Sequence, residues 1–137
     1  EAVNAYKKAL ELDKNNTEFM LAIANIYKDD LKTDDARKYY EQILAVEPQN
    51  LDSLFYLSVI LFESGNDAKA KEYLLSAIKV KSDFANAYYL LGMISDKKRN
   101  YPEAITYYKK FVELNPKDVN VQQVKKRVSQ IENAIKK

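Results

Sequence analysis

The sequence predicts an all-α protein, a solenoid of stacked antiparallel helix hairpins. The chain of 137 residues has only two glycines and three prolines, which is typical of long helices joined by short turns. Its apolar residues recur with helical spacing. The pattern also repeats every 34 residues without gaps, as in proteins that are built from one repeated structural unit.

Each repeat unit divides into two halves, and the second half carries a fixed apolar stripe. Its first member is always alanine, and the four copies are Ala2, Ala36, Ala70 and Ala104. Apolar side chains follow at steps of four, three and three residues, as in Tyr108, Phe111 and Leu114 after Ala104. Such steps keep the side chains on one face of an α-helix.

The first half of each unit carries another helical stripe with one small residue near its centre. The small residues are Ala24, Ser58 and Gly92. We expect each of them to face the alanine that begins the second helix of its own unit. Small side chains there let two helices approach closely, so a large residue at Ala70 is expected to cost about 1–3 kcal/mol by overpacking.

The repeat sets the expected elements in order. Residues 1–16 form the second helix of a unit whose first helix is not in the sequence, and complete units follow at 17–50, 51–84 and 85–118. In residues 119–137 the apolar positions are Val121, Val124, Val128, Ile131 and Ile135. We expect this segment to be a C-terminal capping helix that covers the last hairpin. The alternative is a short coiled-coil seam for a second chain.

The segments between the stripes carry residues that end and begin helices. Gly65 can adopt the left-handed conformation that ends a helix, and Thr33 or Asp34 can cap the helix that follows. Pro48 and Pro116 are expected to end the second helices of their units. Each unit is therefore predicted to be a helix, a tight turn and a helix.

This 34-residue pattern resembles the tetratricopeptide repeat. The family's second-helix consensus is very similar to residues 101–116, Tyr-Pro-Glu-Ala-Ile-Thr-Tyr-Tyr-Lys-Lys-Phe-Val-Glu-Leu-Asn-Pro, and the resemblance covers residues 1–118. The chain departs from the family's usual Trp at Met20, Leu54 and Tyr88, and from its usual proline at Lys14 and Ser82. The resemblance implies a right-handed superhelix whose inner wall is lined by the first helices of the units.

The resemblance also places candidate binding residues on that inner wall. They are Leu21, Asn25, Phe55, Tyr56, Val59, Asn86, Tyr89 and Met93, to which the capping segment would add Gln123, Val124 and Arg127. Aromatic side chains supply rigid contact area and asparagine amides bind extended backbone, so we expect a groove for a peptide or helix of a partner protein. The alternative is that neighbouring hairpins or the capping helix bury some of these residues.

One known subtype of the family is disfavoured. Some members hold the acidic C-terminal tail of heat-shock chaperones with Lys, Asn, Asn, Lys and Arg. The matching positions in this chain are Leu21, Asn25, Tyr56, Asn86 and Leu90. Because the basic residues are missing, the sequence argues against a chaperone-tail partner.

Composition argues against catalysis and bound cofactors. The chain has no cysteine and no histidine, which rules out disulfides, Cys or His zinc sites and imidazole triads. The neighbouring carboxylates at 29–30 and 34–35 lie in or beside a turn, where capping and solvation explain them. We therefore expect no catalytic residue, no metal and no cofactor.

Charge argues against nucleic acid and membrane partners. The net charge is only +2, basic residues gather only at 97–99 and 125–127, and the centre of the expected inner wall is apolar, so RNA is not the expected partner. No apolar run of about 18 residues could span a membrane. The compartment stays unknown. The start at Glu1 suggests a piece of a longer chain, and the Lys, Asn and Tyr usage is typical of AT-rich bacterial genomes.

The expected function is that of a non-catalytic protein–protein interaction module, a scaffold or adaptor that binds a partner in its concave groove. The alternative is a self-association or assembly element that uses the repeat edges or the convex face. Tyr6, Ala9 and Leu10 lack a preceding helix in this sequence. The N-terminal half-unit is therefore expected to pair with another copy at high concentration.

Overall fold

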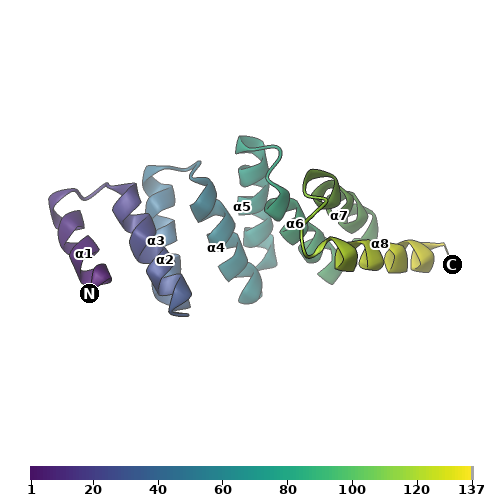
Figure 1. Ribbon diagram of the computed structural model, residues 1–137, viewed down its shortest axis with the longest axis horizontal. Coiled ribbons are helices and arrows are strands. Elements are labelled where there is room, and N and C mark those ends of the chain that lie inside the picture. Colours follow the sequence, from purple (N-terminus) through teal and green to yellow (C-terminus); the bar gives the residue numbers. More distant parts are fainter. Residues whose placement is uncertain (137) are drawn as a thin grey trace. The chain divides into compact units, whose positions relative to one another are not determined.

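The computed structural model describes residues 1–136, and helices are its only regular elements over that range (Figure 1). The helices are α1 (Ala2–Leu12), α2 (Thr17–Asp29), α3 (Thr33–Val46), α4 (Leu51–Glu63), α5 (Asp67–Val80), α6 (Ala85–Lys97), α7 (Tyr101–Leu114) and α8 (Val121–Ile135). The all-α prediction is confirmed. The end of the predicted capping segment, Lys137, lies outside the described residues.

The helices belong to two compact parts, which divide within α5. The first part comprises residues 1–73 and the second begins at Leu74. In the first part α1 packs on α2, α2 on α3 and α3 on α4. In the second part α6 packs on α7 and α7 on α8. The pairs α2/α3 and α6/α7 are the predicted helix hairpins (Figure 1).

The small residues of the repeat are buried, with one exception. The buried set is Ala24, Ala36, Ser58, Ala70, Gly92 and Ala104. Ala2 is exposed, contrary to its predicted packing role, because the sequence holds no first helix to face it. The close approach at Gly92 involves a side chain that was not predicted there. A Cβ placed on Gly92 would lie 2.5 Å from Cδ1 of Tyr108, so the ring of that tyrosine occupies the space beside the glycine.

The hairpin turns repeat one backbone conformation at the 34-residue interval. Gly65 has a φ of 87°, and Leu31 and Arg99 at the matching positions have φ values of 60° and 63°. This left-handed residue ends the first helix of each hairpin in the manner usually left to glycine. The prediction that Thr33 or Asp34 caps α3 was wrong. Lys32 takes the N-cap position, and α3 already begins at Thr33 without a side-chain cap.

The last helix packs inward, as a capping helix does. Val121, Val124, Val128 and Ile131 are buried in one cluster with residues of α7, including Phe111. A coiled-coil seam would leave these side chains on an outer face, so the arrangement favours the cap. None of the described helices combines the length and the apolar character needed to cross a membrane.

Candidate functional site

In the first part, Tyr40 of α3 links two first helices, α2 and α4. Its side chain is fully buried. The hydroxyl donates a hydrogen bond to Oδ1 of Asn25 on α2, at 2.6 Å. Its ring stacks on Tyr56 of α4, with 5.9 Å between the centroids and 29° between the planes. Asn25 and Tyr56, both predicted as binding residues, are therefore fixed in position by one core side chain.

Two aromatic side chains, Phe55 and Tyr56, form a cluster beside Tyr40, and the side chain of Lys28 lies over one of their rings. The ammonium group of Lys28 lies 3.7 Å from the centroid of the Tyr56 ring, within the range of a cation–π contact. The ring of Phe55 meets Tyr56 edge to face at 5.5 Å. These residues come from α2 and α4, as do Leu21 and Val59. We call the set Leu21, Asn25, Lys28, Phe55, Tyr56 and Val59 the α2/α4 surface, and all six side chains are half-buried.

The electrostatic environment of this surface is acidic. Burial raises the pKa of the Tyr40 hydroxyl above its usual value, and Tyr56, Asp29 and Asp52 raise it further. Two carboxylates that act on a buried hydroxyl in this way lie close enough to shape the local potential. Both Asp29 and Asp52 are exposed.

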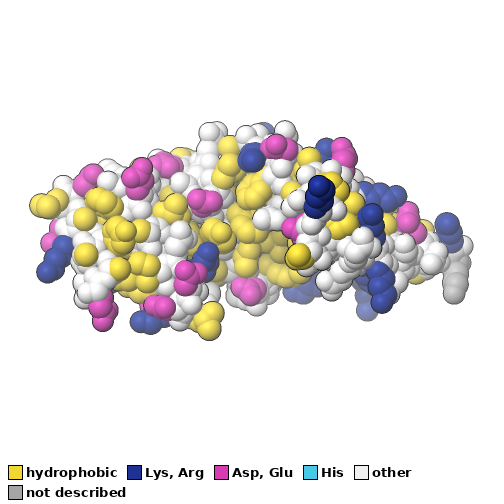
Figure 2. Space-filling model, viewed as in Figure 1, with side chains coloured by type: hydrophobic (Ala, Val, Ile, Leu, Met, Phe, Trp, Pro, Cys, Tyr) yellow, Lys and Arg dark blue, Asp and Glu magenta, His cyan; other side chains and the backbone are white. Residues whose placement is uncertain are grey.

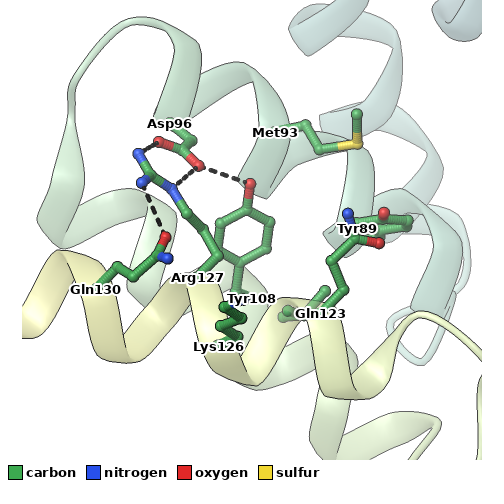
Figure 3. Close-up of a pocket in the computed structure, with 9 residues that line it drawn as sticks. Tyr89, Met93, Asp96, Tyr108, Gln123, Lys126, Arg127 and Gln130 are labelled. Carbon is green, nitrogen blue, oxygen red and sulfur yellow. Dashed lines mark hydrogen bonds and ion pairs between the residues drawn. The ribbon is translucent and has the colours of Figure 1, made fainter.

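In the second part, a pocket of about 410 Å³ opens between α6, α7 and α8 (Figure 3). Tyr89 and Met93 of α6 form an apolar side, and Gln123, Lys126 and Gln130 of α8 form a polar side. These are the positions, counted by the 34-residue repeat, that correspond to the α2/α4 surface and its neighbours. The pocket is thus the C-terminal counterpart of the predicted inner wall.

An ion pair anchors α8 beside this pocket. Asp96 of α6 accepts two hydrogen bonds from Arg127 of α8, at 2.8 Å from Nε and 2.7 Å from Nη2 (Figure 3). The buried Tyr108 hydroxyl donates a third, at 3.1 Å. Hydrogen bonds from Arg127, above all, hold the pKa of the Asp96 carboxyl below its usual range, although burial opposes them. Asp96 thus stays ionised and is paired on both of its oxygens.

The capping helix covers part of the predicted groove residues of the second part. Tyr89 and Met93 pack against the cluster that contains α8, and the Tyr89 ring stacks on buried Phe111 at 4.8 Å and 21°. Asn86 is exposed. Tyr89 and Met93 are thus partly buried against a cluster of α7 and α8 residues, whereas the α2/α4 surface belongs to the part without α8.

Two residues that were expected on the inner wall are in the core. Leu90 is 6% exposed and Val124 is 3% exposed, because helix stripes of this kind are wide and the next element packs over their margin. The polar roles of Tyr40 and Tyr108 were not predicted. Both were assigned only to the apolar stripe, and a repeat pattern does not show where a buried hydroxyl finds its acceptor.

Comparison with known proteins identifies the family and the fold of the chain. Tetratricopeptide repeat profiles match residues 32–94 and 85–118. The chain belongs to the tetratricopeptide repeat family, a class of protein-interaction modules.

Curated relatives are much longer than this chain. Protein O-mannosyl-transferase TMTC3 of Homo sapiens is 34% identical over 120 residues, which cover 83% of this chain and 13% of the relative. TPR repeat-containing protein MJ1428 of Methanocaldococcus jannaschii is 33% identical over 126 residues, covering 88% and 21%. The chain spans about an eighth to a fifth of these proteins, so the similarity concerns their repeat segments.

Solved structures share the fold over nearly the whole chain. MamA matches with a TM-score of 0.85 and 25% identity, covering 96% of this chain and 75% of that one. The first TPR of Spaghetti (RPAP3), bound to the HSP90 peptide SRMEEVD, matches with a TM-score of 0.77 and 19% identity, covering 88% and 94%. At that identity the second likeness shows the fold alone.

Proposed function

We propose that this chain is a non-catalytic scaffold or adaptor segment that binds a peptide or helix of a partner protein through the inner faces of its first helices. One observation carries the proposal. The α2/α4 surface presents half-buried aromatic and aliphatic side chains, and Tyr40 contacts two residues of this surface, Asn25 and Tyr56, from the core. Preorganised aromatic residues of this kind supply much of the energy in protein interfaces.

A related fold with a bound peptide supports this mode of binding. The tetratricopeptide domain of Spaghetti holds an HSP90 peptide. The same partner does not fit here, because Leu21, Asn86 and Leu90 stand where that subtype of the family has basic residues, and Leu90 is also buried. The transferase names among the relatives belong to proteins of which this chain matches 13%, and we assign no catalytic step to it.

Affinity capture with single variants tests the proposal and locates the contact. Phe55→Ala removes contact area from the α2/α4 surface, and Met93→Ala removes it from the α6/α8 pocket. Leu12→Ala is the matched control, since Leu12 is 93% exposed on α1. We expect a partner that binds the wild type and the Leu12 variant to lose at least about tenfold in affinity with Phe55→Ala, in line with a central aromatic contact.

The alternative function, self-association or assembly through the edges or convex face, predicts a different outcome. A partner, or a second copy of the chain, would then be retained equally by all three variants, each checked for folding by circular dichroism. That result would contradict binding through the first helices.

A further inference from the structure

The first part of the chain is acidic, and four of its acidic residues lie on α2 and α4. Residues 1–73 contain 14 Asp and Glu residues against nine Lys and Arg residues, a net charge of −5. On the face shown in Figure 2, acidic side chains are spread over the region of α1 to α4, with hydrophobic side chains between them. Clustered charge of one sign attracts ligands of the other sign and raises their rate of association.

Four carboxylates on α2 and α4 are available to such a ligand. Glu18 and Asp29 belong to α2, and Asp52 and Glu63 belong to α4; all four are exposed. Among the residues that the structure describes, none of the four is in an ion pair. Lys28 is the basic residue of these two helices, so their helix faces keep an excess of negative charge.

The Tyr56 ring already holds a cation. The ammonium of Lys28 lies over the ring face at 3.7 Å, while Phe55 and Tyr40 fix the ring from its edge and its stacking side. Lys28 thus shows the geometry that a ligand cation would adopt there. A ligand can displace the Lys28 ammonium, because a single cation–π contact of a half-buried lysine contributes only about 1 kcal/mol.

We propose that the α2/α4 surface binds a cationic segment of a partner protein, with a Lys or Arg side chain on the Tyr56 ring and further basic side chains near Asp29, Asp52 and Glu63. The apolar residues Leu21, Phe55 and Val59 contact aliphatic parts of the same segment. This inference rests on the proposed function and specifies the chemistry of its ligand.

The test starts from a displayed library of random 12-residue peptides, selected on the whole chain. Peptides are sorted by whether Phe55→Ala abolishes their retention, since the basic second part of the chain can select acidic peptides at a different place. We expect the Phe55-dependent peptides to be enriched in Lys and Arg. Enrichment in Asp and Glu, or no charge preference, would overturn the cationic ligand and leave the proposed function standing. If no retained peptide depends on Phe55, both fall.

Lys28→Gln then provides a second test, because the variant should bind a cationic peptide more tightly and an acidic peptide more weakly than the wild type. Removing the competing ammonium should raise the affinity of a Phe55-dependent peptide about threefold or more if its ligand group is cationic. An acidic ligand would bind more weakly to the same variant. The affinity is measured by fluorescence anisotropy with the labelled peptide and the whole chain.

Charge neutralisation on the surface gives the matched comparison. Asp52→Asn/Glu63→Gln should weaken the cationic peptide by about threefold to tenfold at low salt, and less at high salt. Glu11→Gln/Glu41→Gln alters the net charge equally but on α1 and α3, and should change affinity less than about twofold. Equal losses in both pairs would show a mere net-charge effect and would overturn the proposed site.

Discussion

The hairpins α2/α3 and α6/α7 share one packing scheme but satisfy the same buried hydroxyl differently. Tyr40 and Tyr108 are two repeat units apart, and both are buried. Tyr40 donates to the neutral amide of Asn25, whereas Tyr108 donates to the ionised Asp96. The acceptor in the first arrangement does not ionise, whereas the second connects α6, α7 and α8 through one carboxylate.

A glycine in α6 lets the Tyr108 ring approach that helix closely. Ala24 and Gly92 occupy matching positions, and the Tyr108 ring lies in the space that a Cβ on Gly92 would fill. At the acceptor positions, Met93 is the repeat counterpart of Asn25 and Lys28 is the counterpart of Asp96, so the two hydroxyls find their acceptors at different places on the first helix. The comparison teaches that repeats with one packing scheme can pair equivalent buried hydroxyls with different acceptors.

The largest expected effect comes from giving the second hairpin the alanine that the first hairpin has at the matching position, Ala24. Gly92→Ala should lower the free energy of unfolding by about 2 kcal/mol, because overpacking against Tyr108 exceeds a helix-propensity gain of about 1 kcal/mol. Urea unfolding followed by circular dichroism measures it. In a Tyr108→Leu background the same substitution should no longer destabilise the protein, and a persistent loss there would exclude the ring as the cause.

A smaller effect is expected from the carboxylate itself. Asp96→Asn should cost about 1 kcal/mol, since it weakens the bonds to Tyr108 and to Arg127, whose side chain is 42% exposed and therefore partly screened. The folded-state pKa of Asp96 is depressed. Its contribution is present above the unfolded pKa of about 4 and is lost as pH falls through the folded pKa.

The pH dependence separates the two hairpins. Between neutral pH and about pH 3, exchange protection of amides in α6 to α8 should fall more in the wild type than in the Asp96→Asn variant. Amides in α2 and α3 should respond equally in both proteins, because Asn25 does not titrate. A similar acid response of α6 to α8 in both proteins would show that Asp96 does not anchor the cap.

The smallest effects concern a feature that the hairpins share. Leu31→Gly and Arg99→Gly should each raise the free energy of unfolding by about 0.5–1 kcal/mol, because both residues have a positive φ that glycine adopts without strain. Gly65→Ala, at the matching turn, should lower it by a similar amount. If glycine at 31 or 99 destabilises the protein, side-chain contacts at these turns outweigh backbone strain.

Much of the fold could be predicted from the sequence because the repeat pattern depends on residues that are close together in the chain. Steps of three and four residues give helices, and the in-phase small residues give hairpins that close tightly. The left-handed turn was predicted only at Gly65, because glycine is the residue that commonly adopts a positive φ. Leu31 and Arg99 adopt the same conformation at the matching positions of their hairpins. The N-cap at Lys32 was missed because lysine is not a typical capping residue.

The sequence by itself determined that this chain is a tetratricopeptide repeat protein with an apolar and aromatic set of residues on its first helices. Only the tertiary structure decided that Tyr40 orders the α2/α4 surface, that Lys28 lies on Tyr56, and that α8 partly covers Tyr89 and Met93. The physical reason is the different sequence separation over which the two kinds of interaction act. Helix periodicity acts over three or four residues, whereas hydrogen-bond partners and burial depend on residues 12 to 31 positions apart.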